Sequence, residues 1–270
     1  MKDLISIREF SKLSGVATST LRFWDDIGLF SPQERNQENN YRYYTPDQII
    51  AINFIKVLSD LKVPLKTISD ADQIRNPETI VQLIRLQEMK LQQEMEEMRV
   101  RYSIMFTRRE MILSGMSADI TKVGIEPRLE SGIIMGPRNE FAEDGSFHEP
   151  FTRFCQAAHE LRINLSSPIG GYHDSIESFI DKPGRPDYFF SIDPTGNHKI
   201  TEGEYLTGYS LGYYGELEDL AERMRVYADE NALNLTGPAY TMYLHDEICV
   251  KDPSQYLAQV CVAVSKRKKR

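Results

Sequence analysis

The chain has 270 residues, of which 41% are hydrophobic and 27% charged, an ordinary globular composition that excludes wholesale disorder. Its three cysteines form no CxxC pair, which excludes a disulfide-rich scaffold, and no apolar run approaches the ~18 residues of a membrane helix. The net charge is −8, and most of the negative charge lies in residues 121–265, which hold 11 Lys and Arg against 23 Asp and Glu. That acidic field favours cationic ligands over anionic ones. We expect a reduced, cytoplasmic protein with no membrane segment.

Residues 4–29 have the pattern of two short helices joined by a tight turn. Ser6 can cap a helix over residues 7–13, with Glu9 completing a capping box. Gly15 lies where that helix must end, and a second helix then runs to Asp26. This pattern predicts a helix-turn-helix, which reads DNA by laying its second helix in the major groove.

The residues that could contact DNA lie on the second helix, in an aromatic run and in a later turn. The run Tyr41-Arg42-Tyr43-Tyr44 is typical of a short β-ribbon, and apolar spacing predicts helices over residues 47–61 and 65–74. Hydroxyls at a helix start and nearby cations can meet phosphates or base edges. The candidates are Ser19, Thr20, Arg22, Phe23, Tyr41, Arg42, Tyr43 and Lys62. Residues 1–75 carry no net charge, so this segment by itself attracts DNA weakly.

Pro77 opens the longest helical pattern, which holds no proline or glycine until Gly115. An apolar residue recurs at every seventh position, namely Ile84, Leu91, Met98, Met105 and Ile112. A second seam beside it is apolar at three of five positions; its residues are Val81, Glu88, Met95, Tyr102 and Arg109. Such a pattern predicts a two-helix coiled coil that makes the protein a homodimer, with packing on the same chain as the alternative. About 35 residues would span roughly 50 Å.

Beyond Gly115 the sequence changes to short β-rich runs with glycines and prolines. We expect strands over residues 123–136, 168–174, 186–192, 203–212, 238–245 and 255–264, and helices over residues 150–161 and 215–231. Their order predicts a ββαββ-type unit that occurs twice, giving an antiparallel sheet with two helices on one face. The fold class is therefore α+β, in three parts: a head over residues 1–75, a linker helix over 76–115 and a second domain over 120–265.

Aromatic side chains are abundant in the acidic second domain. Rings supply apolar area and cation–π attraction, and a carboxylate supplies the counter-charge, which together suit a lipophilic cation. The candidate ligand-binding residues are Phe147, Tyr172, Tyr188, Tyr205, Tyr240, Tyr243, Tyr256 and Glu247. We expect at least half of the domain's aromatic rings to belong to the core instead.

Metal binding and catalysis receive little support from the sequence. Cys155 and His159 share a helix face but make only half of a zinc site. His173, Asp174 and Glu177 could do acid–base work, yet no nucleophile elbow, phosphate loop or HExxH motif accompanies them. We therefore predict no metal, no cofactor and no enzymatic activity.

The head resembles the winged-helix DNA-binding domain of MerR-family transcription regulators. The resemblance covers residues 4–75 and rests on the stretches SIREFS from Ser6, TLRFWDDIGL from Thr20, and YRYY from Tyr41. It implies that Arg22 and Arg42 grip phosphates, that Tyr41 and Tyr43 support the wing, and that Ser19 and Thr20 face the groove. Trp24 stands where the family usually has tyrosine, and Ser59 and Lys62 stand where a cation and a glycine are common.

Residues 120–265 are similar to the GyrI-like effector-binding domain of multidrug-responsive regulators. The match is strongest in ITEGEY from Ile200, YYGEL from Tyr213 and TGPAYTMYLHD from Thr236, and Tyr188 and Tyr256 fall on positions of ligand-stacking tyrosines. Thr241 and Ser254 stand where the family usually has acids. A counter-charge would then come from Glu247, Glu204, Glu177 or the general field.

Together the two resemblances imply a dimeric activator that binds double-stranded promoter DNA. On binding a small lipophilic effector, such proteins kink and untwist the DNA so that RNA polymerase can use the promoter. Two alternatives stay open, a regulator of neutral or anionic ligands and an enzyme or drug-sequestering protein with an accessory head. The basic tail, residues 266–270, is expected to be a disordered end.

Overall fold

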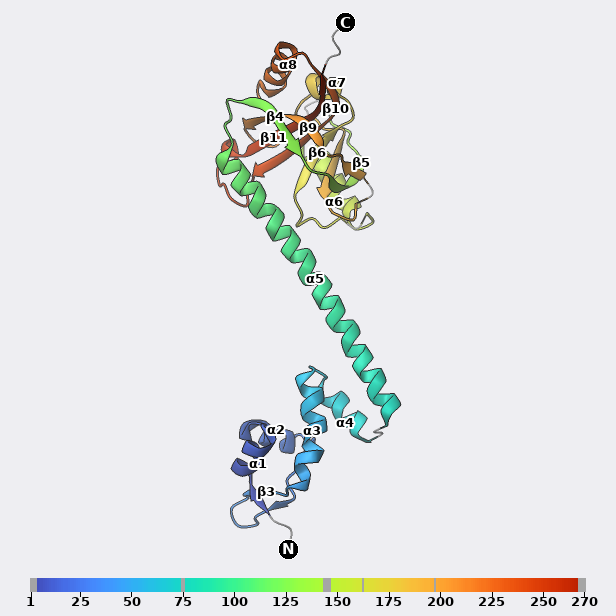
Figure 1. Cartoon of the computed structure of the whole chain (residues 1–270), viewed down its shortest axis with the longest axis vertical. Coiled ribbons are helices and arrows are strands. Elements are labelled where there is room, and N and C mark those ends of the chain that lie inside the picture. Colours follow the sequence, from blue (N-terminus) through green and yellow to red (C-terminus); the bar gives the residue numbers. More distant parts are fainter. Residues whose placement is uncertain (1–3, 74–75, 143–146, 162, 197, 267–270) are drawn as a thin grey trace. The chain divides into compact units, whose positions relative to one another are not determined.

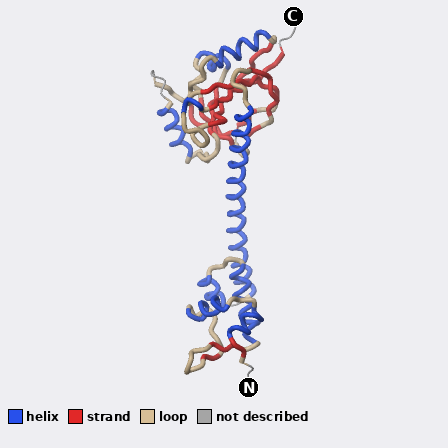
Figure 2. Tube along the Cα trace, turned by 90° about the vertical axis from the view of Figure 1, so that its left-hand side faces the viewer, coloured by secondary structure: helices blue, strands red, loops and turns tan. Residues whose placement is uncertain are grey.

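The protein is described from a computed structural model that covers residues 4–73, 76–142, 147–161, 163–196 and 198–266. The chain divides into two compact units, Met1–Met98 and Arg99–Arg270, and the boundary falls within helix α5 (Pro77–Ser117). Most elements of each unit are labelled in Figure 1, and Figure 2 separates helices from strands. None of the described helices is both long and apolar enough to cross a membrane. Most of the basic tail, residues 267–270, lies outside the described residues.

The first unit contains the predicted helix-turn-helix and ribbon. Its helices are α1 (Ile7–Ser14), α2 (Thr18–Asp26), α3 (Asp47–Asp60), α4 (Leu65–Gln73) and the start of α5. The side chain of Ser6 accepts the Glu9 N–H at the start of α1, and Gly15 ends that helix in the left-handed region at φ +70°. A three-stranded antiparallel sheet has the order β1-β3-β2, with strands β1 (Ile5–Ser6), β2 (Glu34–Arg35) and β3 (Arg42–Tyr44). The hairpin of β2 and β3 forms the wing.

Aromatic rings fill the core of the first unit. Phe10 stacks on Tyr44 with ring centroids 4.4 Å apart, and Phe30 lies 6.0 Å from Tyr44 and 5.9 Å from Phe10, so that the three rings form one cluster. On α2, Trp24 is buried in this core while Phe23 is half exposed. The two neighbouring rings therefore divide between the core and the surface, as the helical spacing requires.

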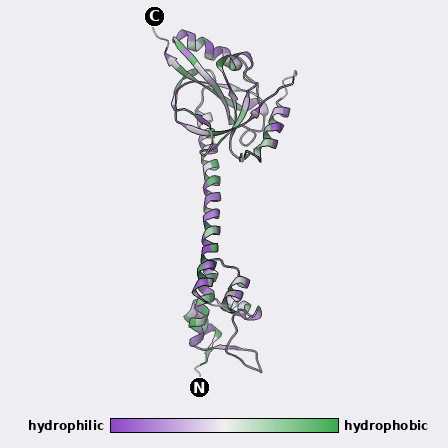
Figure 3. Ribbon diagram, turned by 90° about the vertical axis from the view of Figure 1, so that its right-hand side faces the viewer, coloured by the Kyte–Doolittle hydropathy of each residue, from purple (hydrophilic) through white to green (hydrophobic). Residues whose placement is uncertain are grey.

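Helix α5 has 41 residues and continues two residues beyond Gly115. Gly115 has no side chain, so the ring of His245 can lie directly against the helix at this point. A Cβ on Gly115 would come within 2.5 Å of His245 Nε2. Along the predicted seam Leu91, Met98 and Met105 are 56%, 61% and 64% exposed in the single chain. Figure 3 shows hydrophobic residues recurring along this helix among hydrophilic ones. The seam thus presents apolar surface that could be buried by a second chain.

The second unit is built on one eight-stranded antiparallel sheet with the order β4-β9-β11-β10-β6-β7-β5-β8. The strands are β4 (Val123–Arg128), β5 (Ser131–Arg138), β6 (Ile169–His173), β7 (Tyr188–Ile192), β8 (His198–Ile200), β9 (Gly203–Leu211), β10 (Leu233–His245) and β11 (Leu257–Lys266). The helices are α6 (His148–Ala158), α7 (Ile176–Asp181) and α8 (Leu220–Glu230). The α+β fold class is confirmed.

A repeated unit is present in a form slightly different from the predicted one. The order β-α-β-β occurs in β5-α6-β6-β7, with the short helix α7 inserted between β6 and β7, and again in β9-α8-β10-β11; the strands of the two units lie in mirrored order across the sheet. Strands β8 and β4 extend the two edges. The centre of the sheet, where β6 pairs with β10, is therefore the junction between the two halves.

Several element boundaries were predicted wrongly. The stretch 123–136 is two strands rather than one, because the strand is interrupted at residues 129–130. The first part, β4, pairs with β9, and the second part, β5, pairs with β7. The last strand starts at Leu257, after a 3₁₀ turn over Pro253–Gln255, and α8 starts at Leu220 because Gly215 is in a left-handed turn at φ +89°. Helix α7 and strand β8 were not predicted, and α6 lies a few residues earlier than expected.

Side chains on the two faces of the sheet belong to different clusters. One face, covered by the helices, buries Leu206, Ala239 and Val260 beneath α8 and Phe189 beneath α6. The other face buries Tyr205, Tyr240, Phe190 and Cys261. Since successive side chains of a strand alternate between faces, Tyr240 and its neighbour Thr241 point in opposite directions.

Candidate nucleic-acid interface and ligand pocket

The exposed face of α2 carries the predicted groove-facing residues. Ser19, Arg22 and Phe23 are exposed and follow the i, i+3, i+4 spacing of one helix face, whereas Leu21 and Trp24 are buried. Thr20 is half-buried beside them. The start of α2 has no side-chain cap, so its first N–H groups remain available to an anion such as a phosphate.

The wing is tied to α2 through the carboxylate of Asp25, whose side chain is fully buried. Arg35 Nη2 lies 2.7 Å from Asp25 Oδ2, and Arg42 Nε donates to the same oxygen. Arg42 Nη2 also reaches Asp26 Oδ1 at 3.0 Å. Burial by itself would raise the pKa of Asp25, but the hydrogen bonds from Arg42 and Arg35 outweigh it and hold that pKa below the ordinary 3.8.

This network places Arg42 differently from the resemblance-based expectation. Its side chain is only 16% exposed and is engaged by two carboxylates, so its evident structural task is to fix the wing against α2. A phosphate contact by Arg42 stays a prediction. Tyr41 and Tyr43 contact each other on the wing with ring centroids 5.5 Å apart.

Lys62 lies in the turn between α3 and α4 with φ +62°. This left-handed conformation is the one that glycine adopts without steric cost. The backbone therefore keeps the geometry for which a glycine is suited, and the exposed lysine adds a cation at that turn.

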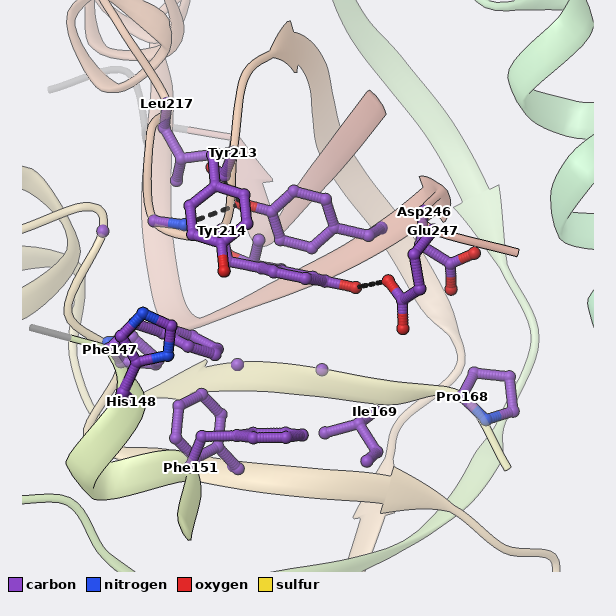
Figure 4. A pocket seen from close by; sticks show the side chains of 18 of the residues that line it. Phe147, His148, Phe151, Pro168, Ile169, Tyr213, Tyr214, Leu217, Asp246 and Glu247 are labelled. Atoms are coloured by element: carbon purple, nitrogen blue, oxygen red, sulfur yellow. Dashed lines mark hydrogen bonds between the residues drawn. The ribbon is translucent and has the colours of Figure 1, made fainter. Parts of the chain in front are cut away.

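A cavity of about 320 Å³ opens on the helix-covered face of the second unit, where the two halves of the sheet meet (Figure 4). Its walls are aromatic and its floor contains residues without bulky side chains. The aromatic walls are Phe147, Phe151, Phe189, Tyr213, Tyr214 and Tyr243, and the floor includes Gly170, Gly171 and Thr241. A volume of this size with apolar walls and few polar groups suits a small organic ligand.

The polar groups of the pocket are few and mostly paired. Arg108, which belongs to α5, donates from Nη1 to Asp246 Oδ2 at 2.8 Å. The Tyr214 hydroxyl donates to Glu247. Thr241 is 7% exposed, and its hydroxyl has no hydrogen-bond partner among the described residues. Because Asp246 is neutralised by Arg108, Glu247 supplies the remaining negative charge of the pocket.

The sequence-predicted ligand residues fall into two groups. Phe147, Tyr243 and Glu247 line the pocket, and Tyr256 lies behind it with its ring centroid 5.6 Å from that of Tyr214. The other four are on the opposite face of the sheet, where their rings contact one another: Tyr172, Tyr188, Tyr205 and Tyr240. The expected counter-charges Glu204 and Glu177 do not line the pocket.

Sequence reasoning missed three kinds of pocket residue. Arg108 comes from the linker helix, 138 residues before its partner, and no local pattern signals that contact. Tyr213 and Tyr214 lie in a loop whose Gly-Tyr-Tyr-Gly sequence, residues 212–215, is the signal that could have identified them. Gly171 of β6 leaves its part of the floor without a side chain, and a Cβ there would lie 2.9 Å from Pro186.

The candidate acid–base residue His173 lies in the core, away from solvent. His173 is fully buried, and burial lowers its pKa to about 4. Its Nδ1 lies 3.5 Å from the Ser178 hydroxyl, and its Nε2 lies 3.2 Å from the Pro183 carbonyl. Among the described residues no group of three or more His, Cys, Asp or Glu could hold a metal ion.

Known proteins resemble this chain both locally and over its length. Residues 5–73 match the MerR HTH family of regulatory proteins. The "Multidrug-efflux transporter 2 regulator" of Bacillus subtilis (strain 168) is 25% identical over 98% of this chain and 97% of its own length. The "Multidrug-efflux transporter 1 regulator" of the same organism is 38% identical over 27% of this chain and 26% of its own. A solved structure, the EcmrR-DNA complex in EcmrR-RPo, is 19% identical with a TM-score of 0.42 over 97% of this chain and 100% of that chain.

Proposed function

The chain belongs to the MerR family of DNA-binding transcription regulators and resembles multidrug-efflux regulators, and from that premise we propose that it activates a promoter when a lipophilic aromatic effector binds its second unit. The observation that carries this proposal is the pocket of Figure 4, which combines aromatic walls with one carboxylate that no cation neutralises. Such a site suits an aromatic cation, since rings attract it by cation–π interaction and Glu247 supplies the counter-charge.

On the DNA side, we propose that two chains pair through the exposed seam of α5 and hold two half-sites. The exposed face of α2 would enter the major groove, and the wing, fixed by Asp25, would lie along the backbone. The effector can drive promoter distortion only by binding the DNA-distorting conformation more tightly than the resting conformation. RNA polymerase is the partner that uses the distorted promoter, and the cytoplasm is the compartment we expect.

The pocket also contains a direct connection to the linker helix. Arg108 lies on α5, and its guanidinium is part of the pocket wall through the ion pair with Asp246. An effector that perturbs this pair changes how α5 is held to the second unit. We propose this contact as the first step by which occupancy acts on the rest of the dimer.

A neutral ligand is the alternative that a specific observation favours. The unpartnered hydroxyl of Thr241 in the pocket floor can donate to or accept from a neutral polar group. A carboxylate at this position would instead have added a second uncompensated negative charge. An anionic ligand is disfavoured by Glu247.

Phe147→Ala is expected to weaken the binding of tetraphenylphosphonium, a lipophilic cation, roughly thirtyfold, or by about 2 kcal/mol. Phe147 stacks on Phe151 and Tyr214 and meets Phe189 edge-on, so its removal deletes one side of the aromatic wall. Isothermal titration calorimetry measures the change. Tyr188→Ala, on the opposite face of the sheet, is the matched control and should bind the cation as the unmodified protein does.

Two results would count against this function. If the unmodified protein binds neither tetraphenylphosphonium nor any of a panel of aromatic cations, effector sensing at this pocket is wrong. If Tyr188→Ala loses binding while Phe147→Ala keeps it, the ligand lies on the opposite face, as the family resemblance of Tyr188 suggests.

A further inference from the structure

The ring of Tyr214 is part of the aromatic wall of the pocket, and its hydroxyl points to Glu247 (Figure 4). It stacks on Phe147 with centroids 5.4 Å apart and an interplanar angle of 13°, and it meets Tyr243 edge-on at 4.6 Å. These are the two arrangements that aromatic pairs prefer. Tyr214 therefore makes the contacts that an aromatic ligand would need at this place.

The hydroxyl of Tyr214 completes the likeness, because it donates a hydrogen bond to Glu247. Burial, together with the adjacent Glu247 carboxylate, raises the pKa of Tyr214 far above its ordinary value, so the phenol stays protonated and acts as the donor. Glu247 is exposed, and among the described residues no ion pair of this pocket carboxylate is found, whereas Asp246 pairs with Arg108. The Tyr214 hydroxyl therefore already occupies the carboxylate with which a cationic ligand would pair.

The backbone on either side of Tyr214 is fixed independently of its side chain. Gly212 donates its N–H to the Tyr256 carbonyl at 3.0 Å, and Gly215 donates its N–H to the Tyr243 hydroxyl at 2.8 Å. Both glycines have positive φ, +149° and +89°. A rotamer change that moved the Tyr214 ring out of the pocket would break its stacking and the hydrogen bond to Glu247, but it would leave these backbone bonds intact.

We infer that Tyr214 is a built-in stand-in for the effector, and that the effector class is a planar aromatic compound with a cationic hydrogen-bond donor at one edge. Such a compound displaces the Tyr214 ring and stacks on Phe147. It then donates a hydrogen bond to Glu247 in place of the Tyr214 hydroxyl. The inference rests on the proposed function of the same pocket and adds the ligand's chemistry and the cost of displacing Tyr214. The free energy needed to break the Tyr214–Glu247 contact is subtracted from the binding free energy of the effector, so the observed affinity is lower.

The test titrates 9-aminoacridine, a planar aromatic cation with an amino donor, and acridine, which is neutral at pH 7.5 and has no donor. The unmodified protein should bind 9-aminoacridine more tightly than acridine. Tyr214→Phe keeps the ring but releases Glu247, so it should bind 9-aminoacridine about fivefold more tightly. Tyr227→Phe, which removes the hydroxyl of a tyrosine on α8 outside the pocket lining, is the matched control and should leave both affinities unchanged.

Glu247→Gln adds a second, independent reading. It should remove the preference for 9-aminoacridine over acridine, and in this background Tyr214→Phe should no longer strengthen binding of the cation. If the unmodified protein binds 9-aminoacridine but Tyr214→Phe binds it equally or more weakly, Tyr214 is a fixed wall of the site and the inference is wrong. If no variant binds either compound, the proposed function fails, and the inference fails with it.

Discussion

Met98→Glu is expected to convert the dimer to a monomer and to weaken promoter binding roughly a hundredfold or more, because the two half-sites are then no longer bound together. Met98 lies at the middle of the apolar seam between Leu91 and Met105, and it is 61% exposed in the single chain. In a paired coiled coil two glutamates would be buried against each other at this position, without a partner for either charge. Sedimentation equilibrium measures the mass, and fluorescence anisotropy measures the affinity for DNA.

The matched control for this change is Gln92→Glu. Gln92 is an exposed residue of the same helix, lies outside both seams, and gains the same charge. This variant should remain dimeric and bind DNA as before. A Met98→Glu protein that sediments as a dimer at micromolar concentration would mean that chains pair through another surface.

Asp25→Asn is expected to destabilise the first unit by about 3 kcal/mol at pH 7, because it leaves two guanidinium groups facing a neutral amide in a buried site. The pKa of Asp25 is lowered in the folded protein, so its carboxylate contributes stability that is fully present above the unfolded pKa of 3.8. That contribution falls as the pH drops through the lower, folded pKa. The difference between Asp25→Asn and the unmodified protein should therefore shrink toward pH 2.

Trp24 provides the readout for this prediction, since it is the single tryptophan and is buried in the core of the first unit. Urea unfolding followed by its fluorescence reports on that unit. Asp26→Asn is the control, because the Asp26 side chain is 65% exposed and its ion pair with Arg42 is solvent-accessible, so the change should cost well under about 1 kcal/mol. An Asp25→Asn protein as stable as the unmodified one at pH 7 would show that the wing is held by other contacts.

The first unit could be predicted closely because its signals are local. The cap at Ser6, the stop at Gly15 and the alternation of Phe23 and Trp24 each act within one or two helical turns, and the structure confirms them. The sheet was predicted less well, because strand boundaries depend on distant partners. Residues 123–136 form an unbroken β-rich run, yet the run is divided between β9 and β7, which lie in opposite halves of the sheet.

The composition of the pocket was predictable, but the identity of its residues was only partly so. Aromatic residues and a carboxylate were expected, and Phe147, Tyr243 and Glu247 line the cavity. Which face of a strand becomes a pocket depends on where the helices pack, so Tyr240 could not be told from Thr241 in advance. Arg108 reaches the pocket across 138 residues of sequence, a contact that only the folded chain reveals.

The central claim is that occupancy of the pocket changes the geometry of bound DNA, and one equilibrium measurement addresses it directly. A duplex selected by the protein from a random library carries a fluorescent donor and acceptor at its ends, and energy transfer is followed as 9-aminoacridine is titrated into the complex. We expect the transfer efficiency to change as 9-aminoacridine saturates the complex. The two ligands should also be coupled equally in both directions: bound duplex should change the affinity for 9-aminoacridine by the same factor as bound 9-aminoacridine changes the affinity for the duplex. Identical transfer efficiencies at zero and saturating 9-aminoacridine, with both molecules bound, would contradict the claim.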